Sequence, residues 1–245
     1  MTMKTDAIIL AAGRGVRMRS ELPKVSHAIF GKPMITWVLE AVKGLDVDDI
    51  FVVVGYKAEM VKAECEGSNV TFVEQKEQLG TGHAVMQAAP YIKDSLVIVL
   101  NGDMPLIKTD TLKEFISQHL KSKSASATVL TAVLPDPGSY GRIVRDRDDR
   151  ILKIVEKRDA SESELAIKEI NTGTYCFNSK ALFGALNDVK PDNSQKEYYL
   201  TDVIGILTKR GLPVYAYKAG DPNEVLGVNT MDELKRLEEL FKNAS

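Results

Sequence analysis

Short apolar runs alternate with amphipathic segments of helical length through the first half of the chain, and this alternation limits the possible folds most. The apolar runs are predicted strands at residues 6–12, 49–55, 69–75, 95–103 and 125–134. The first four are apolar at nearly every position, as is typical of strands covered on both faces. Helical patterns occupy the intervals, at 32–42, 56–66, 80–92 and 109–120. The sequence therefore predicts an α/β fold, with a Rossmann-like, mainly parallel sheet and helices on both of its faces.

The second half of the chain departs from this pattern. Apolar runs flank the charged turn RDRDDR within residues 135–157, which predicts a β-hairpin, and we expect a lid over about 136–185. Further strands are predicted at 171–177 and 212–219, and helices at 178–186 and 201–210. A last helix, 230–245, begins at Thr230 followed by Glu233, a capping-box signature. We expect its apolar side, Met231, Leu234, Leu237 and Phe241, to dock on the chain's own domain.

Composition excludes several classes of protein. The 245 residues are 44% hydrophobic, which is enough for one large core. A formal net charge of −2 gives no single-sign field for nucleic acid or anionic membranes, and we expect neither as a partner. No apolar run approaches the roughly 20 residues of a membrane span, and the first residues lack the pattern of a signal peptide. We therefore expect a cytoplasmic protein in which Cys65 and Cys176 are reduced, structural thiols.

The loop after the first strand has the ingredients of an anion site. Met18 stands where the dinucleotide fingerprint needs its third glycine, and no Gly-Lys-Ser/Thr follows Gly13 as a Walker loop requires. Gly13 and Gly15 nevertheless allow backbone amides to approach a ligand, and Pro23 restricts the chain before Lys24. Positive charge comes from Arg14, Arg17, Arg19 and Lys24. The loop is predicted to bind a triphosphate, and the alternative is a solvated basic turn.

Two further loops carry candidate functional residues. Asp103 lies at the carboxyl end of the strand at 95–103, where a carboxylate suits Mg²⁺ held between protein oxygens and substrate phosphates. The alternative is an aspartate satisfied by neighbouring turn amides. Gly80, Thr81 and Gly82 open a predicted helix and suit contact with the edge of a base, although capping of that helix by Thr81 explains them equally well.

These motifs together resemble the sugar-nucleotide pyrophosphorylases. The resemblance covers about Asp6 to Asn229 and rests on LAAGRGVRM…LPK, EQLGTGHAVMQAAP, GDMPL, YGRIVRD, EINTG, EYYLTD and GVN, in that order. The chain is most similar to members that make UDP-N-acetylglucosamine, a cell-wall precursor. The resemblance implies a nucleotidyltransferase domain over 1–229, with the lid as its sugar-binding part, followed by the helix at 230–245. Bifunctional members continue into a β-helix acetyltransferase domain, which we do not expect in this sequence.

The resemblance also implies a role for each matching residue. Residues expected to contact the nucleotide are Leu10, Ala11, Ala12, Gly13, Gln75, Gly80 and Thr81. Residues expected to be catalytic are Arg17, Lys24 and Asp103, the first two on the triphosphate. Asp103 and Asn229 are expected to hold Mg²⁺. Residues expected to contact the sugar are Asn101, Gly141, Glu156 and Asn171. Two positions depart from the family pattern, because Val16 replaces a usual threonine and Asn101 replaces a usual tyrosine.

The implied substrates are UTP and N-acetyl-α-D-glucosamine 1-phosphate, with Mg²⁺ as cofactor. A phosphate monoester is mostly a dianion at neutral pH, so the attacking group needs no general base and His27, His83 and His119 are predicted to be structural. Open alternatives are glucose 1-phosphate or another acceptor, dTTP or CTP as nucleotide, and a non-catalytic nucleotide-binding regulatory module. Met18 disfavours a nicotinamide-dependent oxidoreductase. The sequence leaves open the oligomeric state and whether the chain is part of a longer protein.

Overall fold

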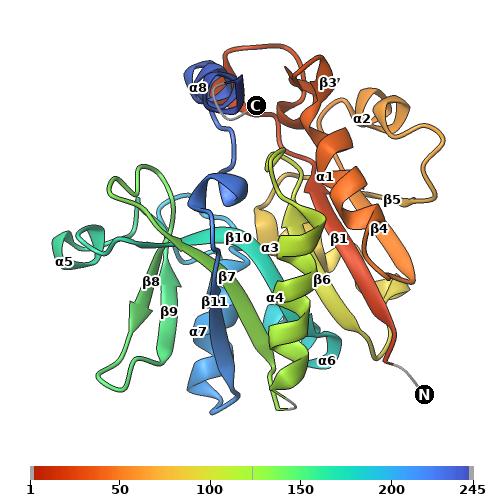
Figure 1. Ribbon diagram of the computed structural model, residues 1–245. Helices are drawn as coiled ribbons and strands as arrows, with labels where there is room; N and C mark the ends of the chain where they lie inside the picture. Colours follow the sequence, from red (N-terminus) through yellow and green to blue (C-terminus); the bar gives the residue numbers. More distant parts are fainter. Residues whose placement is uncertain (1–2, 123, 243–245) are drawn as a thin grey trace.

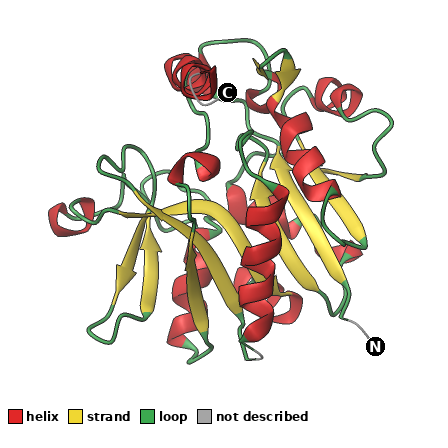
Figure 2. Cartoon of the chain, viewed as in Figure 1, coloured by secondary structure: helices red, strands yellow, loops and turns green. Residues whose placement is uncertain are grey.

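The computed structural model describes residues 3–122 and 124–242, and the strands among them form one large sheet and one small sheet (Figures 1 and 2). The nine strands of the large sheet are β1 (Thr5–Ala11), β4 (Asp49–Val54), β5 (Thr71–Glu74), β6 (Leu96–Asn101), β7 (Ala127–Val133), β8 (Arg142–Arg145), β9 (Ile151–Val155), β10 (Glu169–Asn178) and β11 (Val214–Lys218). The small antiparallel pair is β2 (Ala28–Ile29) with β3 (Lys32–Pro33).

The main path of the large sheet runs β11-β7-β10-β6-β1-β4-β5. Strands β6, β1, β4 and β5 are mutually parallel, as are β11 and β7, whereas β10 lies antiparallel between β6 and β7. The predicted hairpin is confirmed as β8 and β9, and β8 attaches to β10. The predicted α/β fold is therefore confirmed, and β10, within the segment expected to form the lid, belongs to the central sheet.

Helices cover both faces of the sheet (Figure 1). One face packs against α1 (Met34–Lys43), α2 (Ala58–Glu64) and α4 (Thr109–Lys121). The other face packs against α3 (Thr81–Met86), α6 (Ser179–Leu186) and α7 (Thr201–Lys209). The short α5 (Glu162–Leu165) follows the hairpin, and α8 (Met231–Lys242) is the last helix. None of the helices in the described residues is long and apolar enough to span a membrane.

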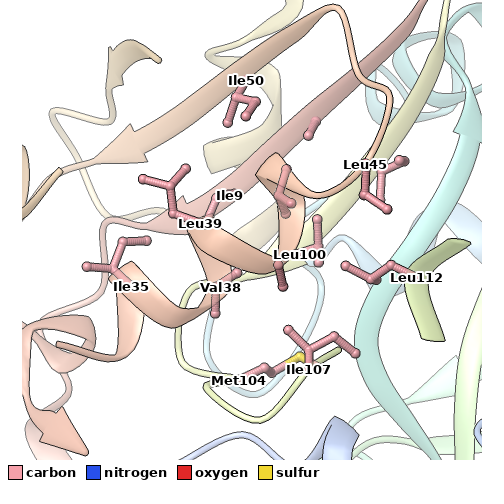
Figure 3. Packing of buried hydrophobic residues seen from close by; sticks show 14 of the residues in the cluster. Ile9, Ile35, Val38, Leu39, Leu45, Ile50, Leu100, Met104, Ile107 and Leu112 are labelled. Carbon is pink, nitrogen blue, oxygen red and sulfur yellow. The ribbon is translucent and has the colours of Figure 1, made fainter. Parts of the chain in front are cut away.

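Two-sided burial explains why β1, β4 and β6 are apolar at most positions. In β1, Ile9 points to the cluster under α1 while Ile8 points to the opposite cluster. Figure 3 shows Ile9 and Leu100 from neighbouring strands beside Leu39 of α1. Each of these side chains is almost completely buried, and each contributes roughly 1.5–3 kcal/mol of transfer free energy. A charged side chain in place of Ile8 or Ile9 would therefore face one of the two apolar clusters.

Helix α8 docks on the chain's own domain, as expected for part of its apolar side. Leu234 and Leu237 are 6% and 4% exposed and pack against a cluster that includes Met18 and Met34. Met231 is exposed and lies outside this contact. The side chain of Phe241 and residues 243–245 lie outside the described residues.

The start of α8 differs from the predicted capping box by one residue. The backbone N–H of Glu233 donates to the Thr230 hydroxyl at 3.1 Å, which confirms Thr230 as the cap. The Glu233 carboxylate, however, accepts the N–H of Asn229 at 2.6 Å rather than that of Thr230. The cap therefore also fixes the backbone of Asn229, one of the candidate metal ligands.

Replacing Leu237 with alanine is expected to release α8 from the rest of the domain. The substitution leaves a cavity in the small cluster that contains Met18, at a cost of about 2–5 kcal/mol. Because α8 lies near the end of the chain, we expect the loss to appear as local opening. Hydrogen–deuterium exchange should quicken across α8 while β1 and β6 keep their protection. The exposed Leu120→Ala variant is the control, and equal loss of protection throughout the domain would contradict local docking.

The cysteines and histidines have structural surroundings. Cys65 and Cys176 are free and buried, and burial raises the pKa of the Cys65 thiol to about 11. Burial also lowers the pKa of His119 to about 4, and its Nδ1 lies 2.8 Å from the Thr128 hydroxyl. His83 lies between two glutamine side chains. These groups are held neutral or within local hydrogen bonds, in line with the structural roles predicted for them.

Candidate active site

The loops that follow β1 and β6 meet at one edge of the sheet. The two strands are parallel neighbours, with Leu10 paired to Asn101 near their carboxyl ends. The N–H of Gly102 then donates to the Leu10 carbonyl at 2.9 Å. The phosphate loop and Asp103 therefore begin side by side, at the edge where open α/β sheets bind ligands.

Four predicted site residues converge at this edge. The Lys24 ammonium contacts Asp103 Oδ2 and donates to Asn229 Oδ1 at 2.7 Å. Arg17 Nη2 donates to the same Asn229 oxygen at 2.8 Å. The structure thus brings together residues from three distant segments of the chain, with two cations facing two oxygen ligands.

Local backbone geometry directs Lys24 into this cluster. Gly15 has φ +69°, and a Cβ there would lie 2.7 Å from Lys24 Cβ, so this position requires glycine. The Lys24 N–H donates to the Gly13 carbonyl at 3.4 Å. His27 Nδ1 lies 3.2 and 3.1 Å from the carbonyl oxygens of Pro23 and Lys24, so it carries the proton and donates. His27 therefore has a structural role, which is to hold the turn that presents Lys24.

The other basic residues of the loop point elsewhere. The Arg14 guanidinium lies 5.3 Å from the centre of the Tyr56 ring, and Arg19 is exposed. Met18, which occupies the position of a fingerprint glycine, is 1% exposed and packs in the cluster beneath α8. The loop is thus built as a basic turn anchored by Met18, with Arg17 and Lys24 as the cations that reach the cluster.

Asp103 has a carboxylate oxygen available for a further ligand. Asp103 is 9% exposed, and its Oδ1 is buried with no hydrogen-bond partner among the described residues. No backbone amide in that part of the chain donates to this carboxylate, so the turn-amide alternative is not observed. The Asp103 carboxylate has a buried oxygen that the described residues leave unpaired, and it shares the Lys24 ammonium with the Asn229 amide oxygen. This arrangement suits Mg²⁺, which prefers oxygen donors and keeps phosphates or water as its other ligands. The residues present therefore fit a magnesium ion.

The residues expected to face the base form a second group. Gln75 is buried, and its Nε2 donates to the Gly80 carbonyl at 3.0 Å. Gly80 has φ +111°, and a Cβ there would lie 2.6 Å from the Tyr198 carbonyl oxygen. The Thr81 hydroxyl accepts the N–H of Leu200 at 3.0 Å and does not cap α3, which corrects the capping alternative. Thr81 thereby fastens this loop to the segment 197–202.

The first nucleotide segment ends β1 and enters the phosphate loop. Ala11 and Ala12 are buried, Leu10 is half-buried and Gly13 is exposed. A Cβ at Gly55 would lie 2.9 Å from Ala12 Cβ, so the end of β1 lies close against the end of β4. The backbone of residues 10–13 therefore leads directly from the sheet to the cluster around Lys24.

The residues expected to contact the sugar also lie together. The Gly141 carbonyl accepts the N–H of Asn171 at 2.9 Å, and a Cβ at Gly141 would lie 3.4 Å from Glu156 Oε1. Asn171 Nδ2 donates to the Tyr175 hydroxyl at 2.8 Å. Burial raises the pKa of the Glu156 carboxyl, against a hydrogen bond from Thr201 that lowers it. This group lies beside the sheet, at the end of the hairpin.

A cavity extends from the phosphate loop to the residues expected to contact the sugar. Its volume is about 230 Å³, and its lining includes Arg17 from the phosphate loop, Glu156 from the hairpin and Tyr199. Asn101 lies nearby at the end of β6, where its amide is so close to Gly173 that a Cβ would collide with it. Gly173 has φ +83° and accommodates this contact. A ligand in the cavity would therefore touch both the phosphate loop and the sugar group.

Some residues of the site had no role in the sequence analysis. Tyr140 and Tyr199 lie inside the motifs YGRIVRD and EYYLTD, which carried the resemblance without a function for either tyrosine. Glu233 was predicted only as a helix cap. The signal that could have drawn attention to the two tyrosines is their place inside these motifs, and for Glu233 it is its place four residues after the Asn229 of GVN.

The fold and this cluster define an α/β protein with a candidate ligand site at the carboxyl ends of parallel strands. The chain belongs to the nucleotidyl transferase family, whose model matches residues 6–222. The family resemblance drawn from the motifs is thereby confirmed.

Comparison with individual proteins gives closer relatives. The chain is 50% identical over 241 residues to the bifunctional protein GlmU of Brevibacillus brevis, covering 98% of this chain and 52% of that one. It is 46% identical over 242 residues to the bifunctional protein GlmU of Alcanivorax borkumensis, covering 99% and 53%. The chain spans about half the length of these curated relatives.

A solved structure shares the fold. The crystal structure of UDP-glucose pyrophosphorylase complexed with UDP-glucose matches with a TM-score of 0.77, covering 99% of this chain and 100% of that one. The two sequences are 19% identical, so this likeness concerns the fold alone.

Proposed function

We propose that this chain transfers the uridylyl group of UTP to N-acetyl-α-D-glucosamine 1-phosphate, forming UDP-N-acetylglucosamine and pyrophosphate. The observation that carries the proposal is the convergence of Arg17, Lys24, Asp103 and Asn229 beside a cavity that reaches Glu156. Membership of the nucleotidyl transferase family supports the reaction type. The relatives named bifunctional protein GlmU, together with the motif resemblance, support the choice of nucleotide and sugar.

The reaction is an in-line displacement at the α-phosphorus of UTP. A phosphate oxygen of the sugar 1-phosphate attacks while pyrophosphate departs, and the attacking dianion needs no proton removed. The main obstacle is repulsion between anions, so the protein contributes positive charge and alignment. Arg17 and Lys24 supply the positive charge at the phosphate loop. The base of UTP is received by the group of residues that contains Gln75 and Gly80.

Magnesium would be held by Asp103 and Asn229, and when bound it would neutralise phosphate charge in the transition state. The Lys24 ammonium contacts the second Asp103 oxygen, Oδ2, and Asn229 Oδ1, so its positive charge lies beside the position proposed for the metal. We assign the reaction to the cytoplasm, in line with the free thiols Cys65 and Cys176.

Pyrophosphate release from the purified chain tests the proposal. With UTP and Mg²⁺, we expect N-acetylglucosamine 1-phosphate to be used far better than glucosamine 1-phosphate or glucose 1-phosphate. Removing Mg²⁺ with a chelator is expected to stop release. If glucose 1-phosphate is the only acceptor used, the proposed acceptor is wrong and the proposed reaction type still holds. No release with any of the three acceptors would contradict the proposed activity.

A further inference from the structure

One hydroxyl joins two loops of the candidate site. The Tyr140 hydroxyl accepts the N–H of Gly227 at 2.8 Å and donates to the carbonyl of the same residue at 3.2 Å. Burial raises the pKa of the Tyr140 phenol, so the hydroxyl keeps the proton that it donates. The ring packs against the main core cluster. Tyr140 is therefore a fixed attachment point for Gly227 rather than a mobile surface contact.

The Gly227 end of this link lies against the candidate metal ligands. A Cβ at Gly227 would be 3.2 Å from Asp103 Oδ1, the carboxylate oxygen that has no partner among residues 3–122 and 124–242. The next residue, Val228, donates its N–H to the Asp103 carbonyl at 2.9 Å. Asn229 follows directly. The position of Gly227 therefore helps to set how the oxygens of Asp103 and Asn229 face each other.

The Tyr140 end lies against the sugar group. The Arg142 guanidinium donates to the carbonyls of Tyr140 and Gly138, and Arg142 is 3% exposed. Gly141, directly after Tyr140, accepts the N–H of Asn171. The loop is thus held rigid on the side that faces Glu156. Among the hydrogen bonds of the described residues, those of Tyr140 are the direct connection between loops 137–142 and 226–229.

We propose that Tyr140 is a positioning residue whose hydroxyl fixes Asp103 and Asn229 relative to each other and ties them to the loop that contacts the acceptor. The proposal rests on the function proposed above, because that function gives these oxygens their metal and the loop its sugar phosphate. Hydrogen bonds that support metal-binding residues from behind orient the groups that touch the metal, and their loss weakens metal binding or activity by about 10–100-fold.

The Tyr140→Phe variant tests this role because it keeps the ring in the core and removes only the hydroxyl. We expect the Mg²⁺ concentration for half-maximal activity to rise about tenfold and kcat to fall about tenfold, with the KM for UTP changed less than twofold. Direct Mn²⁺ titration of the free protein, followed by electron paramagnetic resonance, should show a similar weakening. This second measurement does not depend on turnover.

The matched control is Tyr217→Phe. Tyr217 packs against the same core cluster, and its hydroxyl interacts with Glu114 on α4 rather than with a loop of the site. We expect its Mg²⁺ dependence and Mn²⁺ affinity to equal those of the unmodified chain. A Tyr140→Phe protein that is only less heat-stable, with unchanged Mg²⁺ dependence and Mn²⁺ affinity, would overturn the proposal.

A second variant tests the proposal if the Tyr140→Phe protein does not fold. Gly227→Ala leaves the Tyr140 hydroxyl in place and adds a methyl group beside Asp103 Oδ1 at the other end of the link. We expect it to weaken Mn²⁺ binding, and unchanged binding would again overturn the proposal. If the unmodified chain releases no pyrophosphate with any acceptor, the proposed function fails, whereas the Mn²⁺ titrations still decide the role of Tyr140.

Discussion

Turnover is expected to fall by at least about 100-fold when Asp103 is replaced with alanine. Asp103 is the carboxylate in the cluster with Lys24 and Asn229, and it supplies a buried oxygen with no protein partner in the described residues. Without it, the amide oxygen of Asn229 is left as the protein ligand proposed for Mg²⁺. An isolated amide oxygen does not bring the charge that offsets a divalent cation. The measurement is the rate of pyrophosphate release with saturating UTP and sugar 1-phosphate.

The fold is expected to survive this change. The substitution removes a buried carboxylate oxygen that accepts no hydrogen bond from the described part of the chain, and such a group is costly to bury. The Val228 N–H still has its partner, because it donates to the backbone carbonyl of residue 103. Thermal melting should therefore show a folded protein. Asp188→Ala is the control, since it removes a carboxylate whose ion pair with Arg210 lies at the surface.

Mn²⁺ titration distinguishes a metal ligand from a residue that only restrains Lys24. We expect Asp103→Ala to bind Mn²⁺ far more weakly than the unmodified chain. A slow variant with unchanged Mn²⁺ affinity would assign Asp103 to positioning of Lys24, and a near-normal rate would contradict both roles.

The fold could be predicted from the sequence because its signals are local. Strands such as β1 and β4 are apolar at most positions on both faces, and this pattern needs no knowledge of their neighbours. The position of β10 could not be predicted in this way. Its apolar run indicates a strand, but its antiparallel insertion between β6 and β7 depends on pairing between distant residues. The lid boundary expected at 136–185 therefore included a strand of the central sheet.

The residues of the candidate site also differ in whether local sequence could predict their position. Lys24 lies in the loop that follows β1, and Asp103 lies just after β6, so the rule that ligands bind at strand carboxyl ends predicts their proximity. Asn229 is far along the chain, and only the family resemblance indicated that it joins them. Tyr140 was not found because its contact with Gly227 leaves no pattern in either local sequence. Met18 was interpreted as a missing glycine, whereas its role is to pack beneath α8.

Replacing Lys24 with alanine is expected to lower turnover by at least about 100-fold as well, for a different reason. Its ammonium is a compact positive charge delivered to the phosphate loop by the turn that Gly15 and His27 hold in place. Loss of this charge leaves the repulsion between the sugar phosphate and UTP less compensated in the transition state. Lys108→Ala is the matched control, because it removes a lysine whose side chain is 60% exposed and forms an ion pair with Glu224.

Metal binding should separate the two variants. The Lys24 ammonium contacts the Asn229 amide oxygen that we assign to Mg²⁺ and the second oxygen, Oδ2, of the Asp103 carboxylate, so it competes with a free cation for this position. We therefore expect Lys24→Ala to bind Mn²⁺ at least as tightly as the unmodified chain in the absence of nucleotide, although its turnover is lost. The contrary result is that Lys24→Ala weakens Mn²⁺ binding as much as Asp103→Ala does. Lys24 would then act by holding the metal ligands in position, and the loss of turnover would not come from loss of its charge at the triphosphate.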